Sequence, residues 1–236
     1  MKKKKTIAVI SGEIRKKLKK LADKKYHATL RKQFGGKVKV YGVKPADRKK
    51  IVDKFYKFFK KTDNVVGTCF LAEWLIKTKT FEETNMGIEL LHKCLNRFNM
   101  QTFWAIERLI DHMNTGVNTD LLCSKLLIPI LKDHPHDASY ITQWAESTNK
   151  WRRRASAIVL LEQVHRKEDM DAAFKIAKIL CGEKNKDVLD KFPDLLLALA
   201  KAAPKETKVL MEDKERKIPE EIFERISKKL KRGKKR

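Results

Sequence analysis

The sequence predicts an all-α fold, and three features of its 236 residues support that prediction. Apolar residues recur at spacings of three and four along almost the whole chain, which is the period of an amphipathic helix. Glycine and proline, which interrupt helices, number only nine and six. Alternation of polar and apolar residues, the pattern of a strand, occurs convincingly only in the short segment KVKVYGV, residues 37–43.

Helix start and stop signals divide this pattern into separate elements. Pro45 and Pro219 stand where the first turn of a helix tolerates proline, and Gly35 with Gly36 separates the first predicted helix from the second. The predicted helices cover residues 11–33, 45–61, 65–78, 81–98, 101–113, 119–132, 137–147, 150–166, 168–183, 187–202, 206–213 and 219–231.

From residue 45 onward the predicted helices form pairs about 35 residues apart, near the period of two-helix HEAT and armadillo repeats. Such pairs stack into a curved solenoid. We therefore predict a HEAT-like solenoid with a concave basic face; the sequence leaves open which helix of each pair lines the concavity. The predicted domains are a basic N-terminal helical region at 1–40, a HEAT-like repeat domain at 41–215, and a C-terminal helix with a basic tail at 216–236.

The chain is strongly basic, with 55 Lys and Arg against 30 Asp and Glu, a formal charge of +25 and a sequence pI near 9.9. This excess predicts a polyanionic partner or an acidic surface, because self-repulsion otherwise disfavours the compact state. Apolar residues make up 42% of the chain, which excludes a disordered basic tail and indicates a substantial core. Positive charge gathers near two predicted helix starts, at Lys44, Arg48, Lys49 and Lys50 and at Arg152 to Arg154. Taken singly such lysines indicate only a solvated face, but with the total charge they favour nucleic acid.

No apolar run reaches the 18 residues of a membrane span, and the apolar stretch in MKKKKTIAVISGEIRKK is too short for a signal peptide. We expect a soluble, intracellular monomer with no membrane partner. Its predicted location is the nucleus in a eukaryote and the cytoplasm otherwise.

No pattern of metal ligands stands out. The four cysteines lack any Cys-x-x-Cys spacing, which argues against a disulfide framework and a zinc ribbon: Cys69, Cys94, Cys123 and Cys181. His134 and His136 in DHPHD are a weak metal signal, since no second ligand pair accompanies them; exposed loop histidines are the alternative. We expect neither a metal nor a cofactor.

Three consecutive arginines, Arg152 to Arg154, lie in the first turns of the predicted helix in NKWRRRASAIVLLEQVH, residues 149–165. The helix dipole makes this end favour anions, so the cluster requires an explanation. By helical spacing Arg154 shares a stripe with Trp151, Ile158, Leu161 and His165. Arg154 must therefore pair with a carboxylate elsewhere in the chain or with a partner from outside.

Three segments carry motifs whose order and spacing are informative. YGVKPADRKKI (41–51) combines a Gly-Val turn with a proline and a basic helix, and NTGVNTDLLCSKLLIPIL (114–131) has an aspartate opening a helix that ends near a proline. WAESTNKWRRRASAIVLL (144–161) has a tryptophan, a helix break and a Trp-x-x-Arg helix start. Together they resemble the AlkD-type DNA alkylation repair glycosylases, HEAT-like solenoids that remove alkylated purines from DNA. The resemblance spans most of residues 40–165.

The resemblance implies a catalytic aspartate at Asp120 and a DNA-contacting arginine at Arg154. Trp151, Arg152, Arg153 and Lys44 are further predicted DNA contacts, and the expected partner is duplex DNA, alkylated or distorted. A carboxylate beside the sugar would stabilise the positive charge that builds up as the N-glycosidic bond breaks.

Each of the two central residues has a plainer alternative. Asp120 would offset the helix dipole in a first turn capped by Thr119 or Asn118. Arg154 would form an internal ion pair, for example with a glutamate of a neighbouring repeat.

The sequence departs from the family at two aromatic positions. The family places a tryptophan four residues before the aspartate, where this chain has Gly116, and another in a later helix, where the nearest equivalent is about Leu195 with Pro193 before it. Those tryptophans are thought to hold the cationic base, a contact worth about 0.5–2 kcal/mol each. Trp104 is a possible substitute, but its place in TFWAIERLI predicts a core residue.

We therefore predict a DNA-binding alkylation repair protein that hydrolyses the N-glycosidic bond of alkylated purines. A non-catalytic protein of the same fold, binding damaged or branched DNA, is the alternative favoured by the missing tryptophans. A scaffold for RNA or an acidic protein is a third, without an aromatic-rich RNA signature to support it. The basic ends, MKKKK and KKLKRGKKR (228–236), fit a solubilising tail, a DNA grip or a nuclear import signal.

Overall fold

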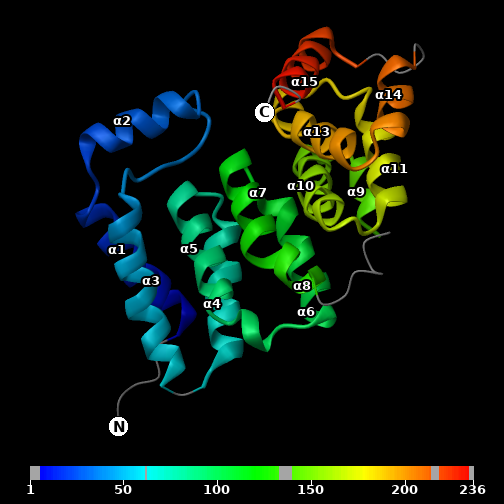
Figure 1. Cartoon of the computed structure of the whole chain (residues 1–236). Coiled ribbons are helices and arrows are strands. Elements are labelled where there is room, and N and C mark those ends of the chain that lie inside the picture. Colours follow the sequence, from blue (N-terminus) through cyan, green and yellow to red (C-terminus); the bar gives the residue numbers. More distant parts are fainter. Residues whose placement is uncertain (1–5, 62, 133–139, 214–217, 234–236) are drawn as a thin grey trace. The chain divides into compact units, whose positions relative to one another are not determined.

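The computed structural model describes residues 6–61, 63–132, 140–213 and 218–233, which fold into helices joined by turns and loops (Figure 1). Within these residues there is no strand, and the KVKVYGV segment contributes only an isolated bridge between Lys39 and Thr80. The predicted all-α fold is confirmed. None of the described helices is both long and apolar enough to cross a membrane.

The chain divides into two compact units, residues 1–126 and 127–236. The first unit contains α1 (Ile7–Lys20), α2 (Lys24–Gln33), α3 (Pro45–Lys60), α4 (Val65–Lys77), α5 (Phe81–His92), the 3-10 turn η1 (Leu95–Arg97), α6 (Met100–Glu107), the 3-10 turn η2 (Arg108–His112) and α7 (Gly116–Leu122). The predicted boundaries at residues 40 and 215 stay predictions.

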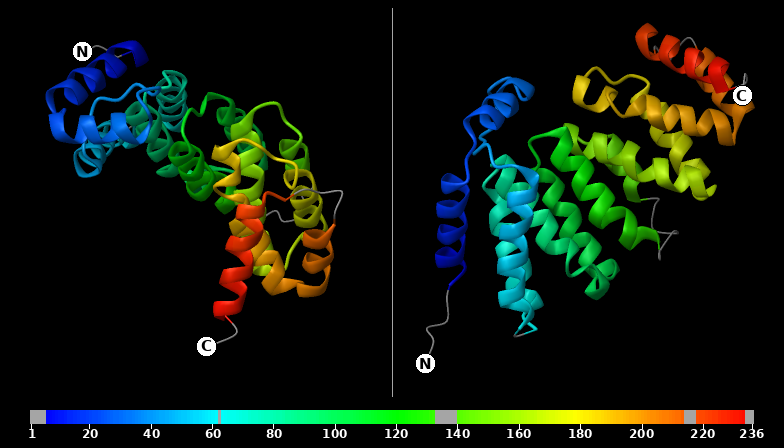
Figure 2. Two further views of the ribbon diagram at one scale, coloured as in Figure 1. Left: turned by 90° about the horizontal axis from the view of Figure 1, so that it is seen from above. Right: turned by 60° about the vertical axis from the view of Figure 1, so that its left-hand side comes forward.

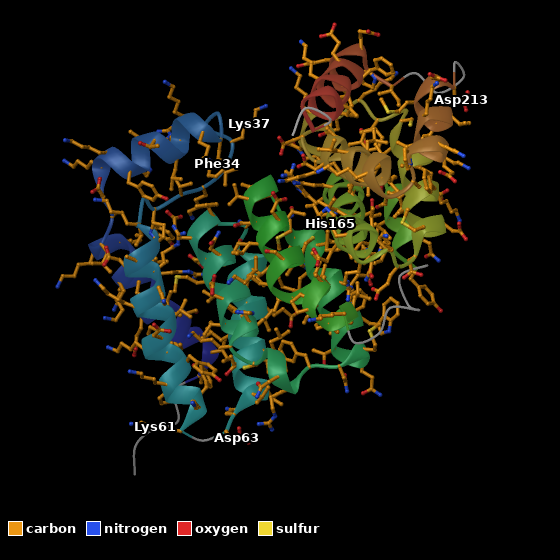
Figure 3. All side chains as sticks on the ribbon, in the orientation of Figure 1. Phe34, Lys37, Lys61, Asp63, His165 and Asp213 are labelled. Atoms are coloured by element: carbon orange, nitrogen blue, oxygen red, sulfur yellow. The ribbon has the colours of Figure 1, made fainter. Side chains whose placement is uncertain are left out.

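Helix α4 is the centre of the first unit, and it contacts α1, α3 and α5. The three helices α3, α4 and α5 lie side by side, and the turn with Lys61 and Asp63 joins α3 to α4 (Figure 3). Close approach of α4 and α5 requires Gly87, because a Cβ there would lie 2.6 Å from the carbonyl oxygen of Ala72. Leu71 and Leu75 of α4 are fully buried, so this packing forms the core of the unit.

The loop before α3 is held by two glutamates at the start of α5. The buried Glu82 carboxylate accepts the backbone N–H groups of Tyr41, Gly42 and Val43 at 3.0, 2.7 and 3.2 Å. Glu83 accepts the Tyr41 hydroxyl at 2.7 Å and pairs with Arg15 of α1 at 3.2 Å. The loop is therefore fastened to α5, and α1 to the same point.

The second unit is built around α10. Its elements are α8 (Ile128–Lys132), α9 (Thr142–Ala145), α10 (Lys150–Arg166), α11 (Met170–Leu180), α12 (Lys186–Leu189), α13 (Phe192–Ala202), α14 (Pro204–Glu212) and α15 (Glu220–Gly233). Helix α10 contacts α9, α11, α12 and α13, and α13 lies between α10 and α15 (Figure 2).

Contacts between first helices of successive predicted pairs occur within each unit, α3 with α5, α5 with α7, and α10 with α13. This is the neighbour pattern expected of stacked helix pairs. The solenoid with a concave basic face stays a prediction.

Two predicted helices are wrong because each is interrupted. The predicted helix 11–33 is α1 and α2, since Asp23 caps a new helix by accepting the N–H of Tyr26 at 2.9 Å. The predicted helix 187–202 is α12 and α13, since Pro193 lies at the start of a second helix. In both cases a capping or first-turn residue begins a new helix inside an apolar pattern that periodicity alone reads as continuous.

The predicted helix 119–132 starts too late and is not uniform. Helix α7 begins at Gly116, and a π-helical segment, η3 (Cys123–Leu127), precedes α8. Pro129 has no N–H to donate to the carbonyl four residues earlier, that of Lys125. The Nδ1 atom of His92 lies 3.1 Å from that carbonyl oxygen, which fits an Nδ1–H donor.

Gly42 is the most constrained glycine of this fold. Its φ is +85°, and a Cβ there would lie 2.5 Å from the Cβ of His27. We expect Gly42→Ala to lower the free energy of unfolding by at least about 1–3 kcal/mol, the cost of strained backbone.

Chemical denaturation should be compared with that of Gly12→Ala, a glycine within α1 that has nothing within 4 Å of an added Cβ. That control should be stabilised by up to about 1 kcal/mol, since alanine favours a helix interior. Equal effects of the two substitutions would contradict the strained-turn interpretation.

Candidate functional site

Asp120 lies in the second turn of α7, not in a first turn. The N-cap is Thr115, whose side-chain oxygen accepts the N–H of Asn118 at 3.1 Å. Asn118 and Thr119, the suggested caps, are fully buried inside the helix. The interpretation of Asp120 as a first-turn carboxylate is therefore wrong, because the helix starts four residues before it.

Helix α7 is fixed in rotation by a buried amide pair. Asn85 of α5 donates from Nδ2 to the Oδ1 atom of Asn118. Within the described structure the Nδ2 atom of Asn118 is buried without a hydrogen-bond partner. With Asn118 turned inward, Asp120 is partly exposed on another side of the helix.

Gly116 and Asp120 are one helical turn apart and share a face of α7. Both are partly exposed. Because helical side chains lean toward the N-terminus, Asp120 leans toward a position that carries no side chain. The site implied by the resemblance therefore has a carboxylate but no aromatic ring one turn before it.

The position of the family's second tryptophan, Leu195, and the possible substitute, Trp104, have opposite environments. Leu195 is fully buried in α13, so its side chain belongs to the core of the second unit. Trp104 is 36% exposed on α6, while its neighbour Phe103 is fully buried and meets its ring edge-on at 5.2 Å. The prediction that Trp104 is a core residue is wrong, since Phe103 occupies the inward position.

Arg154 has an intramolecular partner. Its Nη2 atom lies 3.0 Å from Asp190 Oδ2, and its Nη1 atom donates to the backbone oxygen of Asp187. The Arg154 side chain is 5% exposed, whereas that of Asp190 is 62% exposed. The carboxylate alternative for Arg154 is thus present in the structure, although on an aspartate of the segment before α13 instead of a glutamate.

Arg153 is held by a second carboxylate of the same region. Its Nε atom lies 2.6 Å from Glu183 Oε2, and its Nη1 atom donates to the backbone oxygen of Ser147 at 2.7 Å. Burial tends to raise the pKa of Glu183, but Arg153 and the backbone N–H groups of Asn185 and Lys184 outweigh it and lower that pKa. This ion pair ties the start of α10 to the end of α11.

The remaining predicted DNA contacts are more varied. Trp151 is 8% exposed, and its ring centroid lies 4.4 Å from the Nζ atom of Lys150, which pairs with Asp187 at 2.5 Å. Arg152 is partly exposed. Lys44 is exposed in the first unit and pairs with Asp23 at 2.9 Å, which raises the pKa of Lys44 through a hydrogen bond and charge attraction.

The predicted stripe along α10 is buried only at its beginning. Trp151 and Arg154 are buried, Ile158 and Leu161 are partly exposed, and His165 is exposed. The inward positions near the end of the helix are Gln163 and Val164. Burial does not follow this stripe to His165, because the last turns bury a different side of the helix.

Reasoning from the sequence did not identify which carboxylates pair with the cations at the start of α10. The acidic residues follow their cationic partners by 30 to 37 positions: Glu183, Asp187 and Asp190. This separation is close to the distance of about 35 residues between successive predicted helix pairs. It was the available signal, since stacking brings segments of adjacent pairs together.

Metal-ligand clusters of three or more His, Cys, Asp or Glu side chains do not occur among the described residues. His134 and His136 lie outside those residues. The four cysteines are free thiols, three of them buried.

Comparison with known proteins agrees with this geometry at the level of the family. No curated protein matched the sequence. The family of DNA alkylation repair enzymes matches residues 14–225, which cover most of each unit and include Asp120 and the arginine cluster. The chain belongs to the DNA alkylation repair enzyme family.

Proposed function

We propose that the protein is a DNA glycosylase that hydrolyses the N-glycosidic bond of alkylated purines in duplex DNA. The observation that carries this proposal is the position of Asp120. It is a partly exposed carboxylate in the second turn of α7, with no capping role, in a chain of the alkylation repair family.

The proposed chemistry uses the charge of the damaged base. An alkylated purine is cationic, so it departs as a neutral base with the electron pair of its bond to the sugar. Positive charge then builds on the sugar, where a nearby carboxylate is most stabilising. Water adds to the sugar carbon and loses its proton, and in this proposal Asp120 orients that water.

The alternative is a non-catalytic protein that binds damaged or branched DNA. Gly116 favours it, because the face of α7 that carries Asp120 lacks a ring one turn before the carboxylate. Loss of such a ring would weaken recognition of a cationic base more than it would weaken binding to the backbone.

For DNA binding we retain Arg152, Arg153, Arg154, Trp151 and Lys44 as proposed contacts. Arg154 engages DNA only if a phosphate replaces the carboxylate of Asp190. That exchange is reasonable because Asp190 is largely exposed and a guanidinium binds a phosphate bidentately.

Asp120→Asn should lower release of 7-methylguanine and 3-methyladenine from methylated duplex DNA by about 10²–10³-fold. DNA affinity should be unchanged or slightly higher, because one negative charge near the phosphates is lost. Base release and affinity are to be measured on the same preparations.

Asp111→Asn, an exposed aspartate of η2, is the matched control and should keep full activity. Activity that persists in Asp120→Asn would refute the assigned role. A wild-type protein inactive on every alkylated duplex would establish the non-catalytic alternative instead.

The role of Arg154 is tested by changing each member of its ion pair. Arg154→Ala should weaken DNA binding and also lower the melting temperature, because its bond to the Asp187 carbonyl is lost. Asp190→Asn should raise DNA affinity, because it releases the guanidinium for a phosphate.

Asp171→Asn, on the exposed face of α11, controls for the simple loss of a negative charge. If Asp190→Asn and Asp171→Asn change affinity equally, and Arg154→Ala affects only melting, Arg154 is a structural residue and not a DNA contact.

Binding to undamaged duplex DNA should depend steeply on salt and little on sequence, because the charge of +25 engages phosphates. If about six phosphates are neutralised, the slope of log K against log salt should be about −5. Fluorescence anisotropy at several salt concentrations measures this slope. A flat dependence would exclude DNA as the partner.

A further inference from the structure

A cavity of about 300 Å³ lies in the first unit between α3, α5 and the segment after α7. Its lining is mostly cationic. The polar residues that define it are Arg48, Lys49, Asn85, Glu89, Lys93 and Lys125. Four cations and one carboxylate from three separate chain segments therefore surround one hollow.

Two of these cations are held in place by the protein. Arg48 donates from Nη1 to the Val43 carbonyl at 2.9 Å and lies 5.6 Å from the Phe81 ring centroid. Lys93 pairs with Asp53 at 2.7 Å. Since both side chains are oriented before any ligand arrives, an anion that binds there meets a partly preorganised site.

The other two cations, Lys49 and Lys125, are not held by an ion pair in this way. No carboxylate lies within ion-pair distance of Lys49 or Lys125 in the part of the chain that the structure describes. Like charges gathered around a hollow repel one another, and an anion between them would relieve that repulsion. The cavity thus has unpaired positive charge on two of its sides.

Neutral groups of the cavity also suit an anion. Pro45, the first residue of α3, lines it, so the positive end of a 16-residue helix lies there. Asn85, which is 9% exposed, brings an amide to the wall and connects through Asn118 to α7. The cavity is therefore next to the helix that carries Asp120.

We propose that this cavity binds a phosphate group of the DNA backbone. Its volume suits one phosphate with part of its sugar, and its cations come from α3, from the end of α5 and from the segment after α7. Binding there places the backbone beside α7. The inference rests on the proposed function only in taking DNA as the source of the phosphate.

The test compares two double variants that remove the same charge. Lys49→Ala/Lys125→Ala removes the unpaired cavity cations, while Lys54→Ala/Lys57→Ala removes two exposed lysines of α3 that do not line the cavity. The cavity double should reduce the salt slope for duplex DNA by about 0.9, since the cavity holds one phosphate and each phosphate contact contributes about 0.9. Affinity at 0.1 M salt should fall by about tenfold or more. The control double should change both quantities much less.

Separate ligands identify the source of the phosphate. Duplex DNA, a duplex of uncharged methylphosphonate backbone, duplex RNA and inorganic phosphate are each titrated into the wild-type chain and the cavity double. Loss of affinity confined to the phosphate-bearing DNA supports the proposal. Equal loss for DNA and RNA also supports a backbone phosphate site, without discrimination between the two.

Two results would overturn the proposal. The first is an equal salt slope for the two double variants. The second is binding of inorganic phosphate to the cavity while the salt slope for duplex DNA is the same in the wild type and in the cavity double. Base release is measured in parallel, so a wild-type protein without glycosylase activity but with the cavity-dependent slope would refute the proposed function and keep the phosphate site. Melting curves of both doubles exclude loss of fold as the cause.

Discussion

Much of the first unit depends on the hydrogen bonds between the buried carboxylate of Glu82 and three backbone N–H groups. Glu82 is fully buried and lies at the start of α5, while its donors belong to the loop that leads into α3. Charge-assisted hydrogen bonds of this kind are stronger than those between neutral groups. An isolated buried carboxylate would be costly, so the loop and the glutamate each require the other.

Several features of the first unit follow from that anchor. Gly42 donates to Glu82 and accepts the N–H of Asp23 at 2.9 Å, so the start of α2 is fixed to the same loop. Beside it, burial and the hydrogen bond to Glu83 raise the pKa of the Tyr41 hydroxyl, which stays a neutral donor. Since Pro45 follows this loop directly, the position of α3 depends on it, and so do the cations that α3 contributes to the cavity.

Local signals in the sequence predicted those elements whose ends are determined locally. Helix α10 has the predicted bounds because Asn149 caps it by accepting the N–H of Trp151, and Pro45 starts α3 at the predicted residue. The break between α1 and α2 was missed because its capping residue, Asp23, also depends on a loop 19 positions away. Glu82 and Glu83 occupy the first turn of α5, where acidic residues are common, so no local pattern indicates the loop that they hold.

The residues of the candidate site also differ in whether local sequence signals determine their positions. Asp120 was selected by resemblance, but its position in the second turn depends on the Thr115 cap, which the periodicity did not predict. The partner of Arg154 lies 36 positions away, beyond any local pattern. Residues that act through distant partners are therefore the ones that sequence reasoning assigns least well.

The chemistry proposed for Asp120 requires a helix that does not turn or slide, and α7 has only seven residues. Three contacts within the first unit restrain it: the Thr115 cap at its start, the Asn85–Asn118 amide pair on its buried face, and His92 at the Lys125 carbonyl after its end. A carboxylate held in this way is preorganised for a developing positive charge. Because Gly116 provides no ring, attraction for the cationic base has to come from the negative charge of Asp120 and from phosphates held nearby. Selectivity in the proposed reaction would then reside in the leaving group, because a cationic purine departs readily and a neutral one does not.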